Sequence, residues 1–293
     1  MIPWLRYSYA EVDPVLFIDM SKILSFASWN VEHFYGERER VGRVVDFLKQ
    51  VDPDVFALYE VVGKSVFSDL MNKMATHSFF ITEKTDKVNQ EILIGFRKNL
   101  DVFITQREEF RSKVPTLRPG TLVTVRIDGV DYGLLFLHLK SFPDPRSWGL
   151  RDDMFRNVAS LKRTLDKLPV SNPTANFIAL GDFNTMGLEA PYNNISDLTA
   201  DQEIEFLEKR FNRVKMRRLP KTREITWWNG SPNYVPGGRL DHVFADKNIK
   251  FKKFEDNSEV KVLGWPELES VEAQKDWINA YSDHALIYAE LHS

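Results

Sequence analysis

Short apolar runs recur along the whole chain, and most of them contain Val, Ile or Phe. Their lengths are those of β-strands, and turn-forming or polar residues bound them. The runs occupy residues 22–29, 54–59, 92–96, 121–127, 132–139, 176–180, 240–245 and 284–291. This pattern predicts a protein with a large content of β-structure.

Between these runs, three segments have the period of an amphipathic helix. Residues 37–50, 64–76 and 151–168 each repeat apolar side chains at the spacing i, i+3, i+4 and i+7. We interpret these stripes as surfaces that face a core. Residues 92–139, by contrast, contain consecutive strands with no helix between them, and Asp128-Gly129 is typical of a hairpin turn. A mixed, β-rich core with helices outside it fits better than a purely parallel sheet.

The composition is compatible with one large domain. The chain has 293 residues, of which 43% are hydrophobic and 13% aromatic, and it contains no internal repeat or linker-like segment. We therefore expect a single domain over residues 1–293, with an N-terminal extension at 1–21 and a core at about 22–291. The first 22 residues lack the apolar stretch of a secretory signal, and no window reaches the roughly 20 apolar residues of a membrane span. These features predict a cytoplasmic protein.

Charge and cysteine content exclude several kinds of site. The net charge of −3 arises from 39 basic and 42 acidic residues, so only a local basic patch could attract a nucleic acid or a membrane. The chain has no cysteine, which excludes disulfides and thiolate zinc sites. Any metal must be held by oxygen atoms and histidine.

Polar residues stand at the ends of many of the apolar runs. The stretch FIALGDFNTM, residues 177–186, shows the pattern, because a buried strand leads directly into Asp182 and Asn184. The same kind of residue stands at the ends of five other runs: Asn30, Glu32, Glu60, His138, Asp241, His242, Asp283 and His284. Each of them alone is explained by a turn or a cap. Because neighbouring antiparallel strands bring the end of one beside the start of the next, their recurrence predicts a common rim. Carboxylates without cysteine suit Mg²⁺ or Mn²⁺.

Six of these segments resemble the endonuclease/exonuclease/phosphatase superfamily, which has the deoxyribonuclease I-like fold. The motifs WNVE, LYEV, HLKS, GDFN, LDHVF and SDHALI occur in the order seen in that superfamily and span roughly residues 22–291. The resemblance implies an α/β (α+β) fold, a four-layer α/β/β/α sandwich. In it, two mixed, largely antiparallel sheets pack face to face with helices outside and the active site at one rim.

The resemblance also implies roles for the residues of the motifs. Asn30 and Glu60 match metal ligands, and Asp283 belongs to the same neighbourhood. Asp182, Asn184 and Asp241 would line the phosphate and any second metal, which makes Asp182 and Asn184 candidates for both catalysis and metal binding. His284 matches an acid/base histidine that Asp241 orients. The expected cofactor is Mg²⁺ or Mn²⁺.

His138 matches a phosphate-binding or proton-donating histidine of the deoxyribonuclease and phosphatase branches. Abasic-site endonucleases resembling exonuclease III usually have tyrosine there, so His138 argues against that branch. Glu91 is the candidate partner carboxylate of His138, with Gln90 as the alternative aligned position. We expect a structural role for His242, because strand alternation points it away from Asp241, and the role of His33 stays open.

The reaction requires residues of these types. A phosphodiester is anionic, so metal and cationic groups must neutralise the charge that develops during attack. The attacking water must lose a proton, and a histidine poised near neutral pH can accept it. Together, His138, His284 and one or two metal ions could perform these tasks, with the acid and base roles open between the two histidines.

Local basic and aromatic residues favour nucleic acid as the substrate. Residues 209–223 contain eight cations: Lys209, Arg210, Arg213, Lys215, Arg217, Arg218, Lys221 and Arg223. Two tryptophans, Trp227 and Trp228, follow and could stack on bases. The loop at 141–151 adds Phe142, Arg146, Trp148 and Arg151. The residues predicted to bind substrate are Glu91, Arg146, Arg213, Arg217, Trp227 and Arg239.

Other interpretations remain. A charge run is usually a solvated face, and Trp227 could simply pack in the core. The rival enzyme is a phosphatase or phosphodiesterase of small-molecule, inositol or lipid head-group phosphates. A catalytically inactive binding module is the non-enzymatic alternative, and it predicts gaps in the set of metal and histidine residues. No gap is evident in the motifs.

Overall fold

The computed structural model describes residues 22–35, 38–62, 64–83, 90–168, 174–191, 196–234 and 237–293. The expected N-terminal extension at 1–21 lies outside these residues. In the described part of the chain no helix is both long and apolar enough to cross a membrane.

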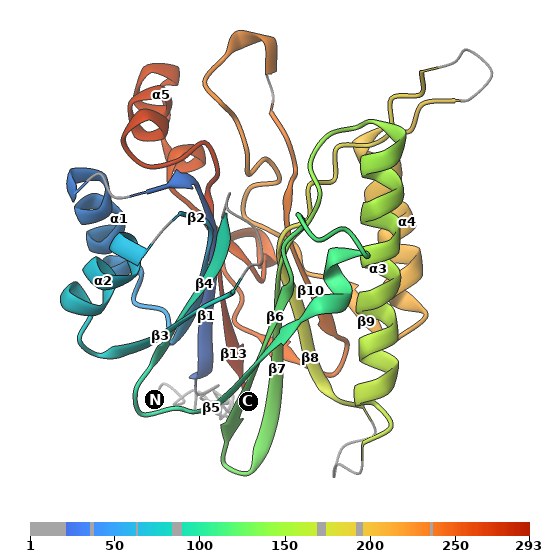
Figure 1. The fold of residues 1–293 in the computed structure, drawn as a ribbon, viewed down its shortest axis with the longest axis horizontal. Helices are drawn as coiled ribbons and strands as arrows, with labels where there is room; N and C mark the ends of the chain where they lie inside the picture. The colour runs from blue at the N-terminus through green and yellow to red at the C-terminus, as the bar shows by residue number, and fades with distance from the viewer. Residues whose placement is uncertain are drawn as a thin grey trace, which may run out of the picture.

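Two mixed β-sheets pack face to face (Figure 1). The first has the strand order β11-β13-β1-β2-β4-β3, with β12 also pairing with β13. Its strands are β1 (Lys22–Phe34), β2 (Val55–Val61), β3 (His77–Ile81), β4 (Glu91–Arg97), β11 (Lys250–Phe251), β12 (Lys261–Leu263) and β13 (Leu286–His292). In this sheet β1 and β2 are parallel, and the other pairs are antiparallel.

The second sheet has the order β5-β6-β7-β8-β10-β9. Its strands are β5 (Asp101–Arg107), β6 (Gly120–Ile127), β7 (Val130–His138), β8 (Asn176–Asp182), β9 (Met216–Arg218) and β10 (Asp241–Asp246). Here β7 and β8 are the parallel pair. The predicted hairpin joins β6 to β7 through Asp128 and Gly129, whose φ angles of 50° and 78° fit a tight turn of the primed type.

Helices cover the outer face of each sheet. On the first sheet lie α1 (Arg38–Val51), α2 (Lys64–Lys73) and α5 (Val271–Ala280), and on the second lie α3 (Pro145–Leu165) and α4 (Ala200–Asn212). Separate apolar clusters fill the three spaces between layers: helices against the first sheet, sheet against sheet, and the second sheet against α3 and α4. The expected four-layer sandwich is confirmed.

All predicted strands and helices are present, with some shifted ends. The helix expected at 151–168 begins earlier, at Pro145, because the Asp144 side chain accepts hydrogen bonds from the backbone N–H groups of Arg146 and Ser147, both at 3.1 Å. Proline is favoured at this first helical position, since its missing N–H would have no helical partner. The sequence analysis missed α4, α5 and the strands β3, β5, β9, β11 and β12.

Candidate active site

Three strand ends of the second sheet meet in register. His138 on β7 lies directly opposite Asp182 on β8, and Asp182 lies opposite Asp241 on β10. Each of these residues is two positions from a residue of the core between the sheets, such as Leu180 or Val243. Because side chains alternate along a strand, all three point into the space between the two sheets, where the apolar core ends.

The first sheet supplies Asn30 and Glu60. Asn30 lies opposite Tyr59 in the pairing of β1 with β2, on the face that points toward the second sheet. Glu60 has a φ of 60°, and the strand register shifts between Leu58 and Val61. A β-bulge of this kind re-aims a side chain. It turns Glu60 toward Asn30 instead of leaving it on the face that packs against the helices.

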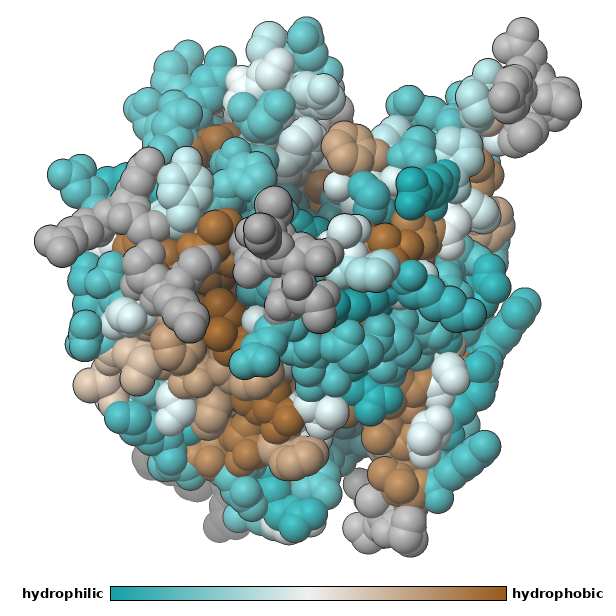
Figure 2. All heavy atoms as spheres, viewed as in Figure 1, coloured by the Kyte–Doolittle hydropathy of each residue, from teal (hydrophilic) through white to brown (hydrophobic). Residues whose placement is uncertain are grey.

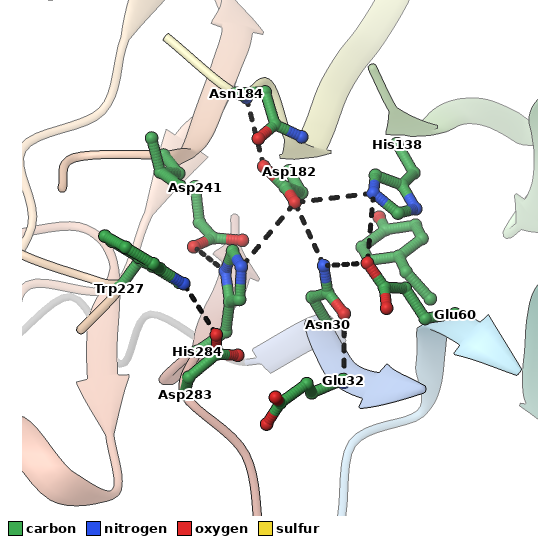
Figure 3. Close-up of polar contacts among 12 residues, drawn as sticks. Asn30, Glu32, Glu60, His138, Asp182, Asn184, Trp227, Asp241, Asp283 and His284 are labelled. Carbon is green, nitrogen blue, oxygen red and sulfur yellow. Dashed lines mark hydrogen bonds and ion pairs between the residues drawn. The ribbon is translucent and has the colours of Figure 1, made fainter. Parts of the chain in front are cut away.

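Asp182 is the centre of the arrangement (Figure 3). Its Oδ2 accepts a hydrogen bond from Asn30 Nδ2 at 3.0 Å and lies 3.6 Å from His138 Nε2 and 3.7 Å from His284 Nε2. The same Asn30 amide donates to Glu60 Oε1 at 3.3 Å, and His138 Nε2 is 3.7 Å from that oxygen. Six strand ends therefore bring these carboxylates, amides and imidazoles together, as the motif pattern predicted.

The stretch that links Asp182 to Asn184 is both a turn and part of this site. The Asn184 N–H donates to Asp182 Oδ1 at 3.0 Å, and Asn184 has a φ of 50°. Its side-chain amide donates to the carbonyl of Leu139 at 3.1 Å. These bonds tie the end of β8 to the residue that follows His138. Local turn chemistry thus fixes the orientation of Asp182.

His284 and Asp241 form a buried pair. His284 Nδ1 lies 2.9 Å from Asp241 Oδ2, and the His284 carbonyl accepts from Trp29 Nε1 at 2.9 Å. Burial disfavours the charged imidazolium, yet the carboxylates of Asp241 and Asp182 outweigh it and raise the pKa of His284 to about 10. The imidazole is therefore charged near neutral pH, so Nδ1 donates its proton to Asp241 and Nε2 also carries a proton, toward Asp182.

His138 and Asp182 respond to burial in opposite directions. Burial raises the pKa of Asp182 to about 7, against the lowering effect of the His284 charge. Burial also lowers the pKa of His138 well below its usual value, and the charges of Arg118 and His284 add to this. The site therefore contains one charged and one neutral imidazole, both facing the same carboxylate.

Glu60 is held by residues that the motifs do not contain. Gln90 Nε2 donates to Glu60 Oε2 at 3.0 Å, and the backbone N–H of His33 donates to the same oxygen at 2.9 Å. Arg118 binds the carbonyl of Gln90 through Nε at 3.1 Å and the Gln90 side-chain oxygen through Nη2. Sequence reasoning missed Arg118, because a single arginine before a strand carries no signal of its own.

Two other residues named from the sequence lie around this centre. Glu91 is buried within the sheet and accepts a hydrogen bond from Thr82 Oγ1. Its neighbour Gln90 is the residue that contacts Glu60. His242 points to the other face of β10, where its Nε2 lies 2.9 Å from Thr185 Oγ1 and its ring packs on Phe183.

Asp283 lies on the side of His284 away from Asp182, and its neighbours are Trp227 and Glu32. Its Oδ2 accepts from Trp227 Nε1 at 2.7 Å. With Glu32 it lines a polar cavity of about 370 Å³. Burial and the nearby charge of Asp283 raise the pKa of Glu32. On its other side Trp227 borders a second cavity of about 280 Å³, whose lining includes Met186, Tyr234 and Leu240.

A sequence comparison identifies the family to which this arrangement belongs. The model of the endonuclease/exonuclease/phosphatase family matches residues 27–284. The chain belongs to this family. Membership places it among hydrolases of phosphate esters. Among curated proteins, no sequence match to the chain was found.

Solved structures of the family share the fold at low sequence identity. Truncated TDP2 from Caenorhabditis elegans is 18% identical with a TM-score of 0.60, over 92% of this chain and 98% of that chain. TDP2 from D. rerio, in complex with a single-strand DNA product, is 17% identical with a TM-score of 0.59, over 92% and 99%. A mannosyl-6-phosphatase from Bacteroides thetaiotaomicron is 17% identical with a TM-score of 0.60, again over 92% and 99%. These likenesses show the fold.

Members of the family generally use divalent metals, and the donors in this chain suit such an ion. Glu60 and Asp182 are two carboxylates that both accept from the amide of Asn30, a set of oxygen donors that fits a hard cation. A second group, Asp182, Asp241 and His284, has one potential ligand atom each within 4.8 Å of the others. Of these, His284 Nδ1 is already engaged by Asp241, so the oxygen set around Glu60 fits such an ion better.

The basic segment 209–223 differs from its predicted role. Lys209, Arg210, Arg217 and Arg218 are all ion-paired with carboxylates of this chain. Lys221 is buried, and burial lowers its pKa to about 8. Five of the eight cations of the segment are therefore paired within the chain or buried.

Arg213 and Arg217 also lie away from the rim. Arg217 pairs with Ala245, four residues along β10 from Asp241, and Arg213 precedes β9. At about 3.3 Å per residue, this position on β10 is roughly 13 Å from the rim. The structure does not bring these two predicted substrate-binding residues to the site.

The remaining predicted substrate contacts lie closer. Arg146 is exposed in the first turn of α3, in the chain segment that follows His138. Arg239 pairs with Asp201 at 2.5 Å and stands two residues before Asp241. Trp228 is buried, so of the two tryptophans only Trp227 borders the rim. In Figure 2 the surface is notched at the upper edge, between the halves of the sandwich, and hydrophilic residues cover most of this face.

Proposed function

We propose that the protein is a divalent-metal-dependent phosphodiester hydrolase that acts on nucleic acid. The observation that carries this proposal is the position of Asp182 Oδ2, which Asn30 contacts and which both His138 and His284 approach within 3.7 Å. A carboxylate between two imidazoles and beside Glu60 offers proton-accepting, proton-donating and cation-binding groups at one point. An inactive binding module would not require this complete set.

The residues divide the work by position. His284 holds a proton at Nε2 because the carboxylates of Asp241 and Asp182 keep its ring charged, and it can donate a hydrogen bond to a phosphoryl oxygen placed against it. His138 reaches the same place from the opposite side, and Asp182 can orient the attacking water through Oδ2. The Asn30 amide fixes Asp182 and Glu60 relative to each other. A cation bound at Glu60 and Asn30 would neutralise the negative charge of the phosphoryl group.

The preference for nucleic acid rests on the wall of the site formed by the second sheet. Arg118, Lys140 and Arg146 gather there, whereas Glu32, Glu60 and Asp283 line the opposite wall. A polyanionic strand is attracted to the first wall, and a cation to the second. The D. rerio TDP2 structure, which shares the fold, contains a single-strand DNA product.

A phosphatase of small phosphomonoesters is the second candidate. The cavity of about 280 Å³ beside Trp227 is large enough for a compact organic group, and one structural neighbour is a mannosyl-6-phosphatase. The two candidates differ in whether the scissile phosphate carries one or two ester bonds, so substrates can separate them.

The test is a substrate panel assayed with Mg²⁺, with Mn²⁺ and with EDTA. It contains plasmid, linear and single-stranded DNA, RNA, bis(4-nitrophenyl) phosphate and mannose 6-phosphate. We expect metal-dependent hydrolysis of the DNA or RNA and of the generic diester. The variant Glu60→Gln should lose most of this activity with an unchanged melting temperature, because an amide binds a hard cation more weakly than a carboxylate. Hydrolysis of the monoester alone, or near wild-type turnover of Glu60→Gln, would contradict the proposal.

A further inference from the structure

Phe142 has an unusual backbone for its side chain. It lies between β7 and α3 with a φ of 81°, and 61% of its surface is exposed. Among the non-glycine residues with positive φ in the described ranges, no other is Phe, Tyr or Trp. Bulky residues rarely adopt this conformation, which persists only where the surroundings enforce it, and such strain clusters at ligand-binding positions.

A buried ion pair enforces this conformation. Arg151 on α3 donates to the Phe142 carbonyl at 2.6 Å and to the Gly187 carbonyl at 2.8 Å, and it pairs with Glu203 on α4 at 2.7 Å. Arg151 is 0% and Glu203 3% exposed. Arg151 was expected to face nucleic acid, and the structure instead uses it to hold the loop. The N–H of Phe142 donates to Met186 Sδ at 3.1 Å, so both backbone groups of Phe142 are bound.

The loop that contains Phe142 begins next to His138 and includes the cation Lys140. The N–H of Leu139 donates to the Asp182 carbonyl at 2.9 Å, which places Phe142 three residues from the site. Lys140 Nζ lies 4.6 Å from the centroid of the Phe142 ring. Burial lowers the pKa of Lys140, the charge of Asp144 opposes this, and the charges of Arg118, Arg151 and Arg146 add to the lowering. An exposed aromatic ring beside a cation is the combination that binds an unpaired base and its phosphate.

We propose that Phe142 and Lys140 form the binding position for the nucleotide next to the cleaved phosphate of a single-stranded nucleic acid. The base stacks on the exposed ring of Phe142, and the Lys140 ammonium faces the neighbouring phosphate. This inference rests on the proposed function and names the form of its substrate. Stacking suits a single strand, because the bases of a duplex are already paired and stacked on one another.

The test compares two oligonucleotides of the same sequence, one with a base next to the cleaved phosphate and one with an abasic residue there. Binding is measured by fluorescence anisotropy in EDTA, independently of hydrolysis. Phe142→Ala and Phe142→Gly should both bind the base-bearing strand about 5- to 100-fold more weakly, the range for loss of one stacked base. Their preference for the base over the abasic residue should fall toward one. Phe142→Trp should retain the preference.

Two variants separate the role of the ring from the role of the loop. Glycine adopts a positive φ freely, so Phe142→Gly keeps the loop conformation while removing the ring. Phe206→Ala is the matched control, because Phe206 on α4 is 50% exposed, has Lys209 Nζ 5.8 Å from its ring, and lies in a regular helix. It should leave the preference for the base unchanged.

An equal loss for both strands, or no loss in Phe142→Gly, would overturn the inference. Failure of the wild-type protein to bind any single strand would overturn it as well. If the same preparation still hydrolyses bis(4-nitrophenyl) phosphate, the phosphodiester activity stands and only the assignment of Phe142 fails.

Discussion

The pairing of Asp241 with His284 shows how single residues set the chemistry of the site. Asp241 Oδ2 fixes His284 Nδ1 at 2.9 Å, so the imidazole presents Nε2 to Asp182. The backbone of Asp241 is fixed in turn, because Thr226 Oγ1 accepts a hydrogen bond from its N–H at 3.0 Å and Lys221 donates to its carbonyl at 2.9 Å. A small change at Asp241 therefore alters the orientation and charge of His284 without touching the substrate.

We expect Asp241→Asn to lower kcat by about 10²- to 10⁴-fold, the range for loss of general acid–base catalysis. The neutral amide no longer stabilises the charged imidazole of His284, so the protonation of the ring changes. His284→Ala should lose a similar factor. Because the two residues act as a unit, the double variant should lose little more than either single variant. Losses that multiply in steady-state assays at saturating metal would show that the residues act independently.

At the scale of single residues, the sequence indicated the groups that carry the chemistry but not the residues that hold those groups in place. Residues such as Asp182 and His284 could be predicted, because each follows or precedes an apolar run within a short motif. The supporting residue Arg118 could not, because its contacts with Gln90 depend on how the start of β6 meets the segment before β4. Arg151 was assigned to the surface, since a charged residue in a loop-like sequence gives no sign of its burial with Glu203.

At the scale of whole elements, the type of burial decided what could be predicted. Strands such as β8 are buried along their length and read as continuous apolar runs. The missed strand β5 lies at a sheet edge with largely half-exposed residues, so its pattern is weak. The helix α4 has an apolar stripe at Ile204, Leu207 and Phe211. The last residues of this helix belong to the basic segment 209–223, and their charges obscure the apolar stripe in the sequence.

The start of α4 provides a test of an element apart from the chemistry. Thr199 and Gln202 form a capping box, in which Thr199 Oγ1 accepts from the Gln202 N–H at 3.2 Å and Gln202 Oε1 accepts from the Thr199 N–H at 2.9 Å. Thr199→Ala should lower the free energy of unfolding by about 1 kcal/mol, as measured by chemical denaturation. Turnover should stay at the wild-type value. A stability loss below the error of the measurement would mean that water replaces the cap.

At the scale of the whole molecule, buried histidines make stability depend on pH. Burial lowers the pKa of His77, and burial together with the charge of Lys221 lowers the pKa of His242 well below 6.5. Both are therefore neutral when folded but bind a proton when the chain is unfolded. Stability is complete above pH 6.5 and falls as the pH decreases toward the folded pKa values.

The expected size of this effect can be measured at one position. Between pH 7.5 and 5.5, His77 should contribute part of the decrease in the free energy of unfolding, because the unfolded chain takes up a proton that the folded protein binds less readily. In His77→Gln that part of the decrease should vanish, while the amide can still donate to the Pro53 carbonyl that His77 Nε2 approaches at 3.2 Å. Denaturation curves of both proteins at the two pH values provide the comparison. Identical pH dependence would show that the pKa of His77 does not change on folding.

The distribution of charge over the molecule leads to the last prediction. Two pairs of cations can be removed with the same change in net charge. Lys140 and Arg146 flank the site, whereas Arg213 and Lys215 lie at the far end of the second sheet, where the Lys247 N–H donates to the Lys215 carbonyl at 2.8 Å. Binding of single-stranded nucleic acid should weaken with salt by about 0.7 in log Kd per contacted phosphate for each unit of log salt.

If the strand follows the wall near Phe142, Lys140→Ser with Arg146→Ser should reduce that slope by about 1.4, because two phosphate contacts are lost. Arg213→Ser with Lys215→Ser should leave the slope unchanged, although the total charge changes equally. Titrations of a fluorescent single strand from low to moderate salt measure both. An equal reduction in the two double variants would mean that the protein attracts nucleic acid through its overall charge. A reduction confined to the Arg213 variant would restore the role that the sequence alone suggested for residues 209–223.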